Sequence, residues 1–224
     1  MSLRTHVLIH GYALEASGWD MTVWGNPPHH LGRLPRGIVA ALDRIADRVI
    51  IGSGLRNSKG QIECEITRDM LLARLANLPD FDALHGRDPA SLASWLLPRL
   101  HLDDQSQTTA EEINHAACNL MAEGGGRLVI VSSPFHLPRC LKEAVLWRER
   151  NSVDPNRLMI EAVVSDASLP DINIGNVAIL EPPHRPDRDA TPLHTVAARL
   201  LTVPVSRRAE LLRELDRLLN TYTK

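Results

Sequence analysis

Cysteine and lysine are scarce in this chain of 224 residues. The three cysteines, Cys64, Cys118 and Cys140, are odd in number and widely spaced, which excludes a disulfide framework and a Cys-x-x-Cys metal site. We therefore expect reduced thiols, most of them buried. Only three of the 25 basic residues are lysines. Because the other 22 are arginines, we expect any anion-binding site to be built from guanidinium groups.

An excess of charge of either sign and a long hydrophobic run are also absent. The 25 lysines and arginines nearly balance the 27 aspartates and glutamates, which leaves a formal net charge of −2. Without a basic excess or a basic stripe, we expect no nucleic-acid partner. No apolar stretch approaches the roughly 20 residues that cross a bilayer, and the first apolar run, residues 7–9, ends at His10 and Gly11. This run predicts a buried strand rather than a signal peptide, and we expect a cytoplasmic protein without a membrane span.

Sequence motifs that would identify a known chemistry are missing. Residues 7–12 are similar to the first strand and His-Gly loop of α/β-hydrolases, but the chain has no Gly-x-Ser-x-Gly elbow for a nucleophilic serine. The segment at residues 52–54, Gly-Ser-Gly, lacks the lysine and the spacing of a phosphate-binding P-loop, and no Gly-x-Gly-x-x-Gly dinucleotide fingerprint occurs. His29 and His30 lie in a proline-rich loop without partners at metal-ligand spacing, so we expect no metal site.

The remaining composition is typical of a globular domain with a full hydrophobic core. Hydrophobic residues make up 44% of the chain and charged residues 23%, and the mean hydropathy is −0.14. A length of 224 residues, against roughly 150 for an average domain, predicts one large domain or one domain with a tail.

Apolar runs that predict strands alternate along the chain with segments whose apolar residues recur at the three- and four-residue spacing of helices. Four strands are predicted, at residues 5–9, 48–51, 127–131 and 157–164. The helices are predicted at residues 36–47, 63–77, 107–123 and 137–150. This alternation predicts an α/β fold: a doubly wound, mostly parallel, Rossmann-like sheet with helices on both faces and right-handed connections. Gly124, Gly125 and Gly126 are expected to end a helix and turn the chain into the next strand.

The α/β domain is predicted to span residues 1–180, with an insertion at about residues 79–98 that contains a short helix at residues 89–97. Residues 181–224 are expected to form a proline-rich linker and a C-terminal helical extension, because four of the first twelve residues are prolines. Helices are predicted at about residues 193–202 and 206–221, and the second is strongly amphipathic, with its leucines in one stripe. We expect this helix to pack on the domain or on a second copy of the chain in a homodimer.

Ligands bind to an open parallel sheet at the carboxyl ends of its strands, near the point where the strand order reverses. The segments that follow the predicted strands carry small residues, hydroxyl groups and ionisable groups. They contain the candidate ligand-binding residues Gly11, Tyr12, Ser53, Gly54, Ser106, Thr109, Ser132 and Ser133, with Asp103 and Asp104 at an expected strand tip. We expect these residues to line a pocket at the strand ends.

His136 and Arg139 are three residues apart near the start of the helix predicted at residues 137–150. They share one face of that helix N-terminus, where free N–H groups and the helix dipole favour an anion such as phosphate or carboxylate. The spacing fits a structural alternative equally well. In that alternative Ser133 caps the helix, His136 is a partly buried histidine with a partner, and Arg139 pairs with a surface acid.

Acidic residues occupy the first turn of two predicted helices. Thr108 and Thr109 each have a glutamate three positions later, which is a capping-box pattern. Helix capping alone accounts for Glu111 and Glu112, so neither residue needs a catalytic or binding role. Glu63 begins another helix, where an acid complements the helix dipole and needs no function either.

Taken in order, the strand-end segments resemble the YdcF-like (SanA/ElyC-like) domain family over roughly residues 5–165. In that family a first strand ends in Gly and a second in Ser-Gly-Gly, and Glu-Ala, Ser-x-x-Thr-x-Glu-Asn and Thr-Ser-x-x-His-x-x-Arg segments follow. The corresponding residues of this chain are Gly11, Ser53, Gly54, Glu63, Cys64, Leu71, Ser106, Thr109, Glu111, Ser132, Ser133, His136 and Arg139. The chain departs from the pattern at Leu55, Cys64 and Glu112, where the family has Gly, Ala and Asn.

The resemblance implies a Rossmann-like fold with a pocket at the strand ends. Soluble members of the family are linked to S-adenosylmethionine binding, and envelope members to peptidoglycan or lipid-carrier processes. S-adenosylmethionine is therefore the one cofactor that the resemblance suggests, and it implies no single reaction.

Three functions fit these patterns. The first is an enzyme-like pocket for an anionic small molecule, such as a nucleotide, S-adenosylmethionine or a phosphorylated metabolite, that catalyses transfer or hydrolysis at a phosphoester or related bond. In this pocket Arg139 and the helix N-termini hold the anion, and Glu63 and His136 are the catalytic acid–base candidates. Glu111 joins the ligand-binding residues because the resemblance implies it. The second function is a non-catalytic sensor that signals through its C-terminal helices, and the third is an interaction scaffold.

Overall fold

The computed structural model describes residues 3–16 and 18–166, together with residues 207, 210, 211, 213, 214 and 217. The chain divides into two compact units, Met1–Asp171 and Ile172–Lys224. In the second unit the six described residues are helical and fall within the helix predicted at residues 206–221. The predicted linker and the helix predicted at residues 193–202 lie outside the described residues.

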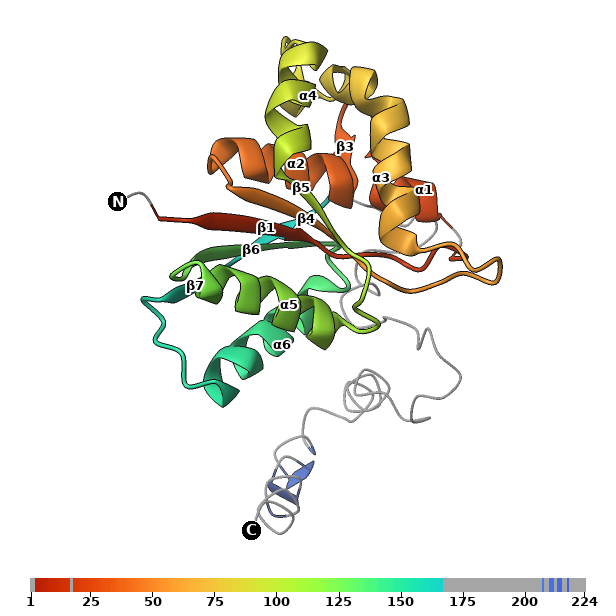
Figure 1. Ribbon diagram of the computed structural model, residues 1–224. Coiled ribbons are helices and arrows are strands. Elements are labelled where there is room, and N and C mark those ends of the chain that lie inside the picture. The colour runs from red at the N-terminus through yellow and green to blue at the C-terminus, as the bar shows by residue number, and fades with distance from the viewer. Residues whose placement is uncertain are drawn as a thin grey trace. The chain divides into compact units, whose positions relative to one another are not determined.

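Five parallel strands form the sheet of the first unit, in the order β5-β4-β1-β6-β7 (Figure 1). Their bounds are β1 Thr5–Ile9, β4 Arg48–Gly52, β5 Leu100–Asp103, β6 Gly126–Ser132 and β7 Leu158–Val164. Two short strands form a separate antiparallel pair, β2 (Gly25–Asn26) and β3 (His30–Leu31).

The helices of the first unit lie between these strands in the chain. The α-helices are α1 Trp19–Val23, α2 Arg33–Asp43, α3 Glu63–Arg74, α4 Pro89–Leu96, α5 Thr109–Ala122 and α6 Leu137–Arg150. Short 3-10 helices are η1 Leu75–Asp80, η2 Asp82–Leu84 and η3 Leu97–Arg99. No helix among the described residues is long and apolar enough to cross a membrane.

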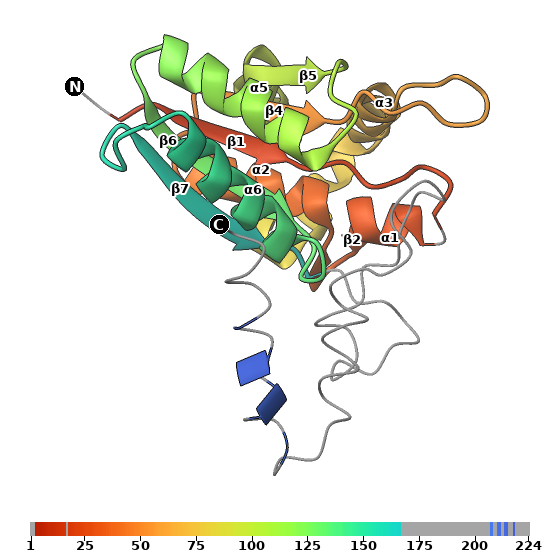
Figure 2. The ribbon, with the colours of Figure 1, turned by 90° about the horizontal axis from the view of Figure 1, so that it is seen from below.

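Helices cover both faces of the sheet. In Figure 1, α2, α3 and α4 lie above the strands and α5 and α6 lie below them, and Figure 2 shows α5 and α6 side by side on their face. Successive residues of β1 point to opposite faces of the sheet. Val7 and Ile9 belong to the core cluster between the sheet and helices α2 and α3, and Leu8 belongs to the cluster between the sheet and helices α5 and α6. The doubly wound, parallel α/β fold predicted from the sequence is confirmed.

Helix α2 lies close to the central strand because it carries a glycine at the contact. A Cβ atom at Gly37 would overlap the side chain of Ile9 on β1. Leu34 and Ile38 on the same helix are fully buried. This packing fixes Arg33, the first residue of α2, next to the carboxyl end of β1, where its side chain bonds to the backbone.

Within residues 3–166 the predicted strands and helices are confirmed to within a few residues, and the differences have physical reasons. The helix predicted to begin at residue 36 begins at Arg33, because Pro35 fits the first turn of a helix, where no backbone N–H is required. The strand β5 is not among the four predicted strands, because it is a four-residue edge strand with one buried residue and no apolar run. The glycine turn is confirmed, since Gly124, Gly125 and Gly126 have φ angles of +106°, +89° and +155°.

The insertion predicted at about residues 79–98 contributes to the core. It contains η2 and α4, which begins at residue 89 as predicted. Phe81, Leu84 and Leu92 are buried in the same cluster as the apolar residues of α2 and α3. The segment therefore thickens the helical layer on that face of the sheet.

The strand order reverses between β1 and β6. From β1 the chain proceeds to β4 and β5 on one side, and it then returns to β6 and β7 on the other side. The backbone N–H of His10 donates to the carbonyl of Val131 at 3.1 Å, so the ends of β1 and β6 lie side by side. This reversal, the switch point, is where open α/β sheets bind ligands.

Candidate functional site

Most of the predicted site residues lie together at the carboxyl ends of β1, β4 and β6. These strand ends meet three helix starts, those of α2, α3 and α6, and the first turn of α5. The predicted residues that lie here are Gly11, Tyr12, Ser53, Gly54, Glu63, Thr109, Ser132, Ser133 and His136. The polar groups among them are mostly buried, so their hydrogen bonds determine what the site can do.

Glu63 is the first residue of α3, and its side chain turns back over the ends of β1 and β4. It is 2% exposed, and the Ser53 hydroxyl donates a hydrogen bond to its Oε2 at 3.0 Å. Its Oε1 has no hydrogen-bond partner among the described residues. A Cβ atom at Gly11 would lie 2.6 Å from this Oε1, so a larger residue at this position would displace the Glu63 carboxyl group. Burial, together with the charge of Glu112, raises the pKa of Glu63 to about 7, although the hydrogen bond from Ser53 opposes the shift.

His10 and Glu112 form a buried pair that the sequence did not predict. The Nδ1 of His10, directly after β1, is hydrogen-bonded to Oε2 of Glu112 on α5. Burial alone would lower the pKa of His10, but charge interactions and hydrogen bonds with Cys140 and Glu112 raise it to about 10. His10 is therefore an imidazolium at neutral pH. A Cβ atom at Gly52 would overlap the Glu112 carboxylate, so a larger residue at this position would displace that carboxylate.

His136 lies between β6 and α6 and contacts residues of three segments. Its Nδ1 is 3.0 Å from the hydroxyl of Ser132, and its Nε2 is 3.2 Å from the hydroxyl of Thr109. The sulfur of Cys140 is 3.5 Å from Nδ1. The ring of His136 meets the ring of His10 edge to face, with 5.6 Å between the centroids. The sequence left open whether His136 is a site residue or a buried histidine with partners, and it is both buried and at the switch point.

Arg33 reaches from the start of α2 across the ends of β1 and β6. It is 1% exposed, its Nε donates to the Ser133 hydroxyl at 2.7 Å, and its Nη1 donates to the carbonyls of His10, at 3.2 Å, and Gly11. The guanidinium carbon lies 5.0 Å from the ring centroid of Tyr12 and 5.9 Å from that of Phe135. Burial lowers the pKa of Arg33, against the charges of Cys140 and Glu63. We call His10, Arg33, Glu63, Glu112 and His136 the switch-point cluster.

The remaining predicted residues have local structural partners. Glu111 is exposed and accepts a hydrogen bond from the backbone N–H of Gln107 at 2.6 Å, so it serves the start of α5. Ser106 is fully buried and bonds to Asp103 and, at 2.9 Å, to His115.

Arg139 completes the predicted set, and Gly54, which follows β4, links two of the segments at the strand ends. The N–H of Gly54 donates to the carbonyl of Ser106 at 2.7 Å, which ties the segments after β4 and β5 together. Arg139 is half-buried in the first turn of α6, and its N–H donates to the carbonyl of His136 at 3.0 Å. Arg139 therefore lies one helical turn beyond the switch-point cluster.

Sequence reasoning missed three members of the cluster for different reasons. Glu112 carried a usable signal, because it shares the buried stripe of α5 with Ile113 and Ala116, where an acid needs a partner. His10 was noted only as the end of a strand. Arg33 gave no signal, because it lies before the apolar pattern of α2 begins.

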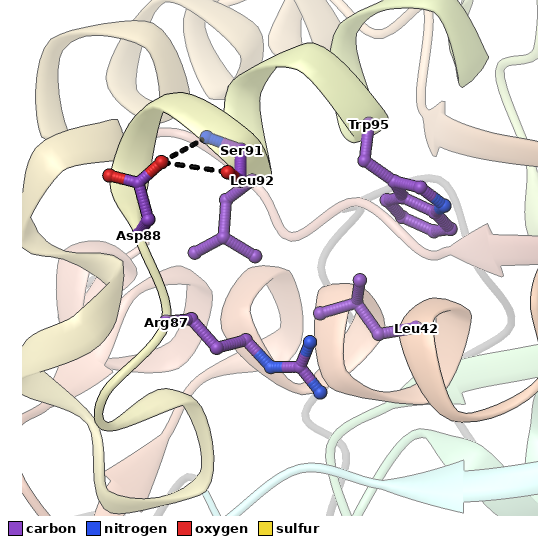
Figure 3. A pocket seen from close by; sticks show the side chains of 6 residues that line it. All are labelled: Leu42, Arg87, Asp88, Ser91, Leu92 and Trp95. Carbon is purple, nitrogen blue, oxygen red and sulfur yellow. Dashed lines mark hydrogen bonds between the residues drawn. The ribbon is translucent and has the colours of Figure 1, made fainter.

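A separate hollow lies between the end of α2 and the start of α4 (Figure 3). Its volume is about 490 Å³, and its lining residues are Leu42, Arg87, Asp88, Ser91, Leu92 and Trp95. Asp88 caps α4, since its Oδ2 accepts hydrogen bonds from the N–H of Ser91 at 2.9 Å and from the Ser91 hydroxyl at 2.7 Å. This hollow shares no residue with the switch-point cluster.

Comparisons with family models, with curated proteins and with solved structures give no match for this chain. The resemblance to the YdcF-like family stays a prediction from the sequence.

Proposed function

We propose that this chain is an enzyme that binds an anionic small molecule at the switch point and uses Glu63 and His136 for proton transfer. The observation that supports this most is the gathering of five buried ionisable side chains in the switch-point cluster. Charged residues are rarely buried in full, and buried groups with shifted pKa values are typical of catalytic sites. These side chains also lie where the strand order reverses, which is the place where open α/β sheets bind ligands.

Glu63 is suited to acid–base chemistry. With a pKa of about 7, its carboxyl group is present in both protonation states at neutral pH. It can therefore accept a proton from a nucleophile or donate one to a leaving group. His136 is the second proton-transfer candidate, with one ring nitrogen next to Ser132 and the other next to Thr109.

The charge of the substrate is inferred from the positive groups near this edge. Arg33 and Arg139 lie at or next to the switch point, and the N-termini of α5 and α6 favour an oxyanion. Nucleotides, phosphorylated metabolites and S-adenosylmethionine fit this description, the last on the strength of the family resemblance. The reaction proposed is transfer or hydrolysis at a phosphoester or related bond.

A thermal-shift panel tests the proposal on wild type and on Arg139→Ala, with S-adenosylmethionine, nucleotides, sugar nucleotides and pyrophosphate. A ligand at 100 times its Kd stabilises a protein by about 2.7 kcal/mol, which raises the Tm of a chain of this size by roughly 5–10 °C. We expect such a rise for at least one anion and a smaller rise in the variant. The absence of a shift with every anion would contradict the proposal.

Catalysis is tested separately with the ligand that gives the shift. His136→Ala is expected to keep binding and to lose turnover of that ligand. Unchanged turnover would make His136 a structural residue only.

A further inference from the structure

Arg33 is a buried cation whose observed partners are all neutral. Its hydrogen bonds go to one hydroxyl, that of Ser133, and to two backbone carbonyls, those of His10 and Gly11. No carboxylate of the described residues forms an ion pair with it, although Arg36 on the next turn of α2 pairs with Asp166 at 2.5 Å. Arg33 thus differs from its neighbour in lacking a counter-ion within residues 3–166.

A buried charge without a counter-ion is unfavourable, and proteins normally pair it. A guanidinium cannot escape the penalty by losing its proton, because its pKa in water lies far above neutral pH. Glu63 and Glu112 are near enough to act on the charge of Arg33, but neither forms an ion pair with it. This arrangement favours an anion supplied by a ligand.

The guanidinium is also held in a fixed orientation. Three of its five N–H groups, those on Nε and Nη1, are used by the hydroxyl and the carbonyls. The rings of Tyr12 and Phe135, both half-buried, lie near the guanidinium carbon from the ends of β1 and β6. The two N–H groups of Nη2 form no hydrogen bond with a described residue. A guanidinium oriented in this way is suited to an oxyanion, which accepts hydrogen bonds in one plane.

We infer that Arg33 is the anion-binding residue of the switch point and that its Nη2 binds an oxyanion of the small molecule. This inference rests on the proposed function and names the group that holds the substrate. Ser133 and the carbonyls of His10 and Gly11 orient Arg33, so they act as positioning groups.

Isothermal titration at pH 7 with inorganic pyrophosphate and with citrate tests the assignment, because the two probes separate a phosphate from a carboxylate oxyanion. In Arg33→Lys, which keeps the charge but loses the planar fork, we expect the Kd of the probe that binds to rise at least tenfold. The matched control is Arg36→Lys, one turn along the same helix, where the arginine already has Asp166 as its counter-ion. Its Kd is expected to stay within twofold of wild type.

A second measurement does not depend on the folding of a variant. The Nε–H resonance of Arg33 in wild type, assigned by triple-resonance NMR, is expected to move and saturate as pyrophosphate or citrate is added. If wild type binds a probe but this resonance stays still, or if Arg33→Lys binds within twofold of wild type, the assignment of Arg33 is overturned and the proposed function stands. If wild type binds neither probe nor any anion of the thermal-shift panel, the proposed function itself fails.

Discussion

Glu63 shows how three small features of the site combine at one residue. The glycine at position 11 leaves room for its carboxyl group, the Ser53 hydroxyl bonds to one oxygen, and the other oxygen is buried without a partner among the described residues. Burial of the carboxyl group favours the protonated form near neutral pH, whereas the hydrogen bond from Ser53 favours the ionised form, and burial has the larger effect. The arrangement lowers the stability of the ionised folded state, which is the usual consequence of a site built for function.

Glu63→Gln is expected to stabilise the protein at alkaline pH. In the folded chain Glu63 has a pKa of about 7, against 4.5 for an ordinary glutamate, so the folded state holds this proton more tightly than the unfolded chain does. The free energy of unfolding of wild type therefore falls as the pH rises from about 4.5 to about 7. Because glutamine does not ionise, the variant should exceed wild type at pH 8 by at most about 3 kcal/mol and gain little at pH 5. Urea denaturation at both pH values measures this difference.

The control for this experiment is Glu149→Gln, which removes a carboxylate from an exposed position at the end of α6. It is expected to change the free energy of unfolding by a similar small amount at both pH values. Equal stability of Glu63→Gln and wild type at pH 8 would contradict the raised pKa.

At the scale of elements, the contact between α2 and β1 positions Arg33. Gly37 allows the helix to lie directly on Ile9, and the buried Leu34 and Ile38 extend the contact. A shift of α2 away from the sheet would move Arg33 away from Ser133, so the packing of one helix and the geometry of the site are linked.

Gly37→Ala is expected to destabilise the fold although alanine favours helices. The gain in helix propensity is about 0.5–1 kcal/mol, whereas the overlap of the new methyl group with Ile9 forces a shift that costs about 1–3 kcal/mol. Urea denaturation of the single variants and of Gly37→Ala with Ile9→Val forms a double-mutant cycle. We expect Ile9→Val to relieve part of the loss, and additive effects would contradict the contact.

The elements themselves could largely be predicted from the sequence, because apolar runs and helical periodicity are local signals. The start of α5 is an example, since the Thr108 hydroxyl caps it by accepting the N–H of Glu111 at 3.2 Å. The site could be predicted only in part. Partners such as His10 and Glu112 are 102 positions apart and meet only through the order of the strands. The hydroxyls and acids at strand ends could be predicted, because each directly follows a local apolar run. The pairs that they form could not be predicted, because pairing depends on the order of the strands.

At the scale of the whole molecule, each end of the sheet carries a buried histidine, and the pKa values of the two histidines are shifted in opposite directions. At the amino end, burial lowers the pKa of His6 although Glu123, 3.3 Å from its Nε2, opposes the shift. Glu123 also pairs with Arg4 at 2.8 Å and Arg48 at 2.6 Å. At the carboxyl end, the pKa of His10 is raised to about 10.

The free energy of unfolding is expected to fall as the pH rises from 7 to 9. Across this range the folded state keeps the proton of His10, which the unfolded chain loses near pH 6.5, so alkaline pH favours unfolding. His10→Gln should therefore flatten the slope between pH 7 and 9, whereas His6→Gln should leave it unchanged, because the lowered pKa of His6 acts below pH 6.5. Urea denaturation at intervals of half a pH unit checks the slopes, and a wild-type stability that rises toward pH 9 would refute the charged His10–Glu112 pair.

The most direct test of the central claim is to map, by NMR, which backbone amides of the wild-type protein move when pyrophosphate is added. The claim is that a small anion binds at the switch point. We predict saturable shifts concentrated at the ends of β1, β4 and β6, around Gly11, Ser53 and Ser133. Shifts centred on the hollow lined by Leu42, Leu92 and Trp95, or no saturable shift at all, would contradict it.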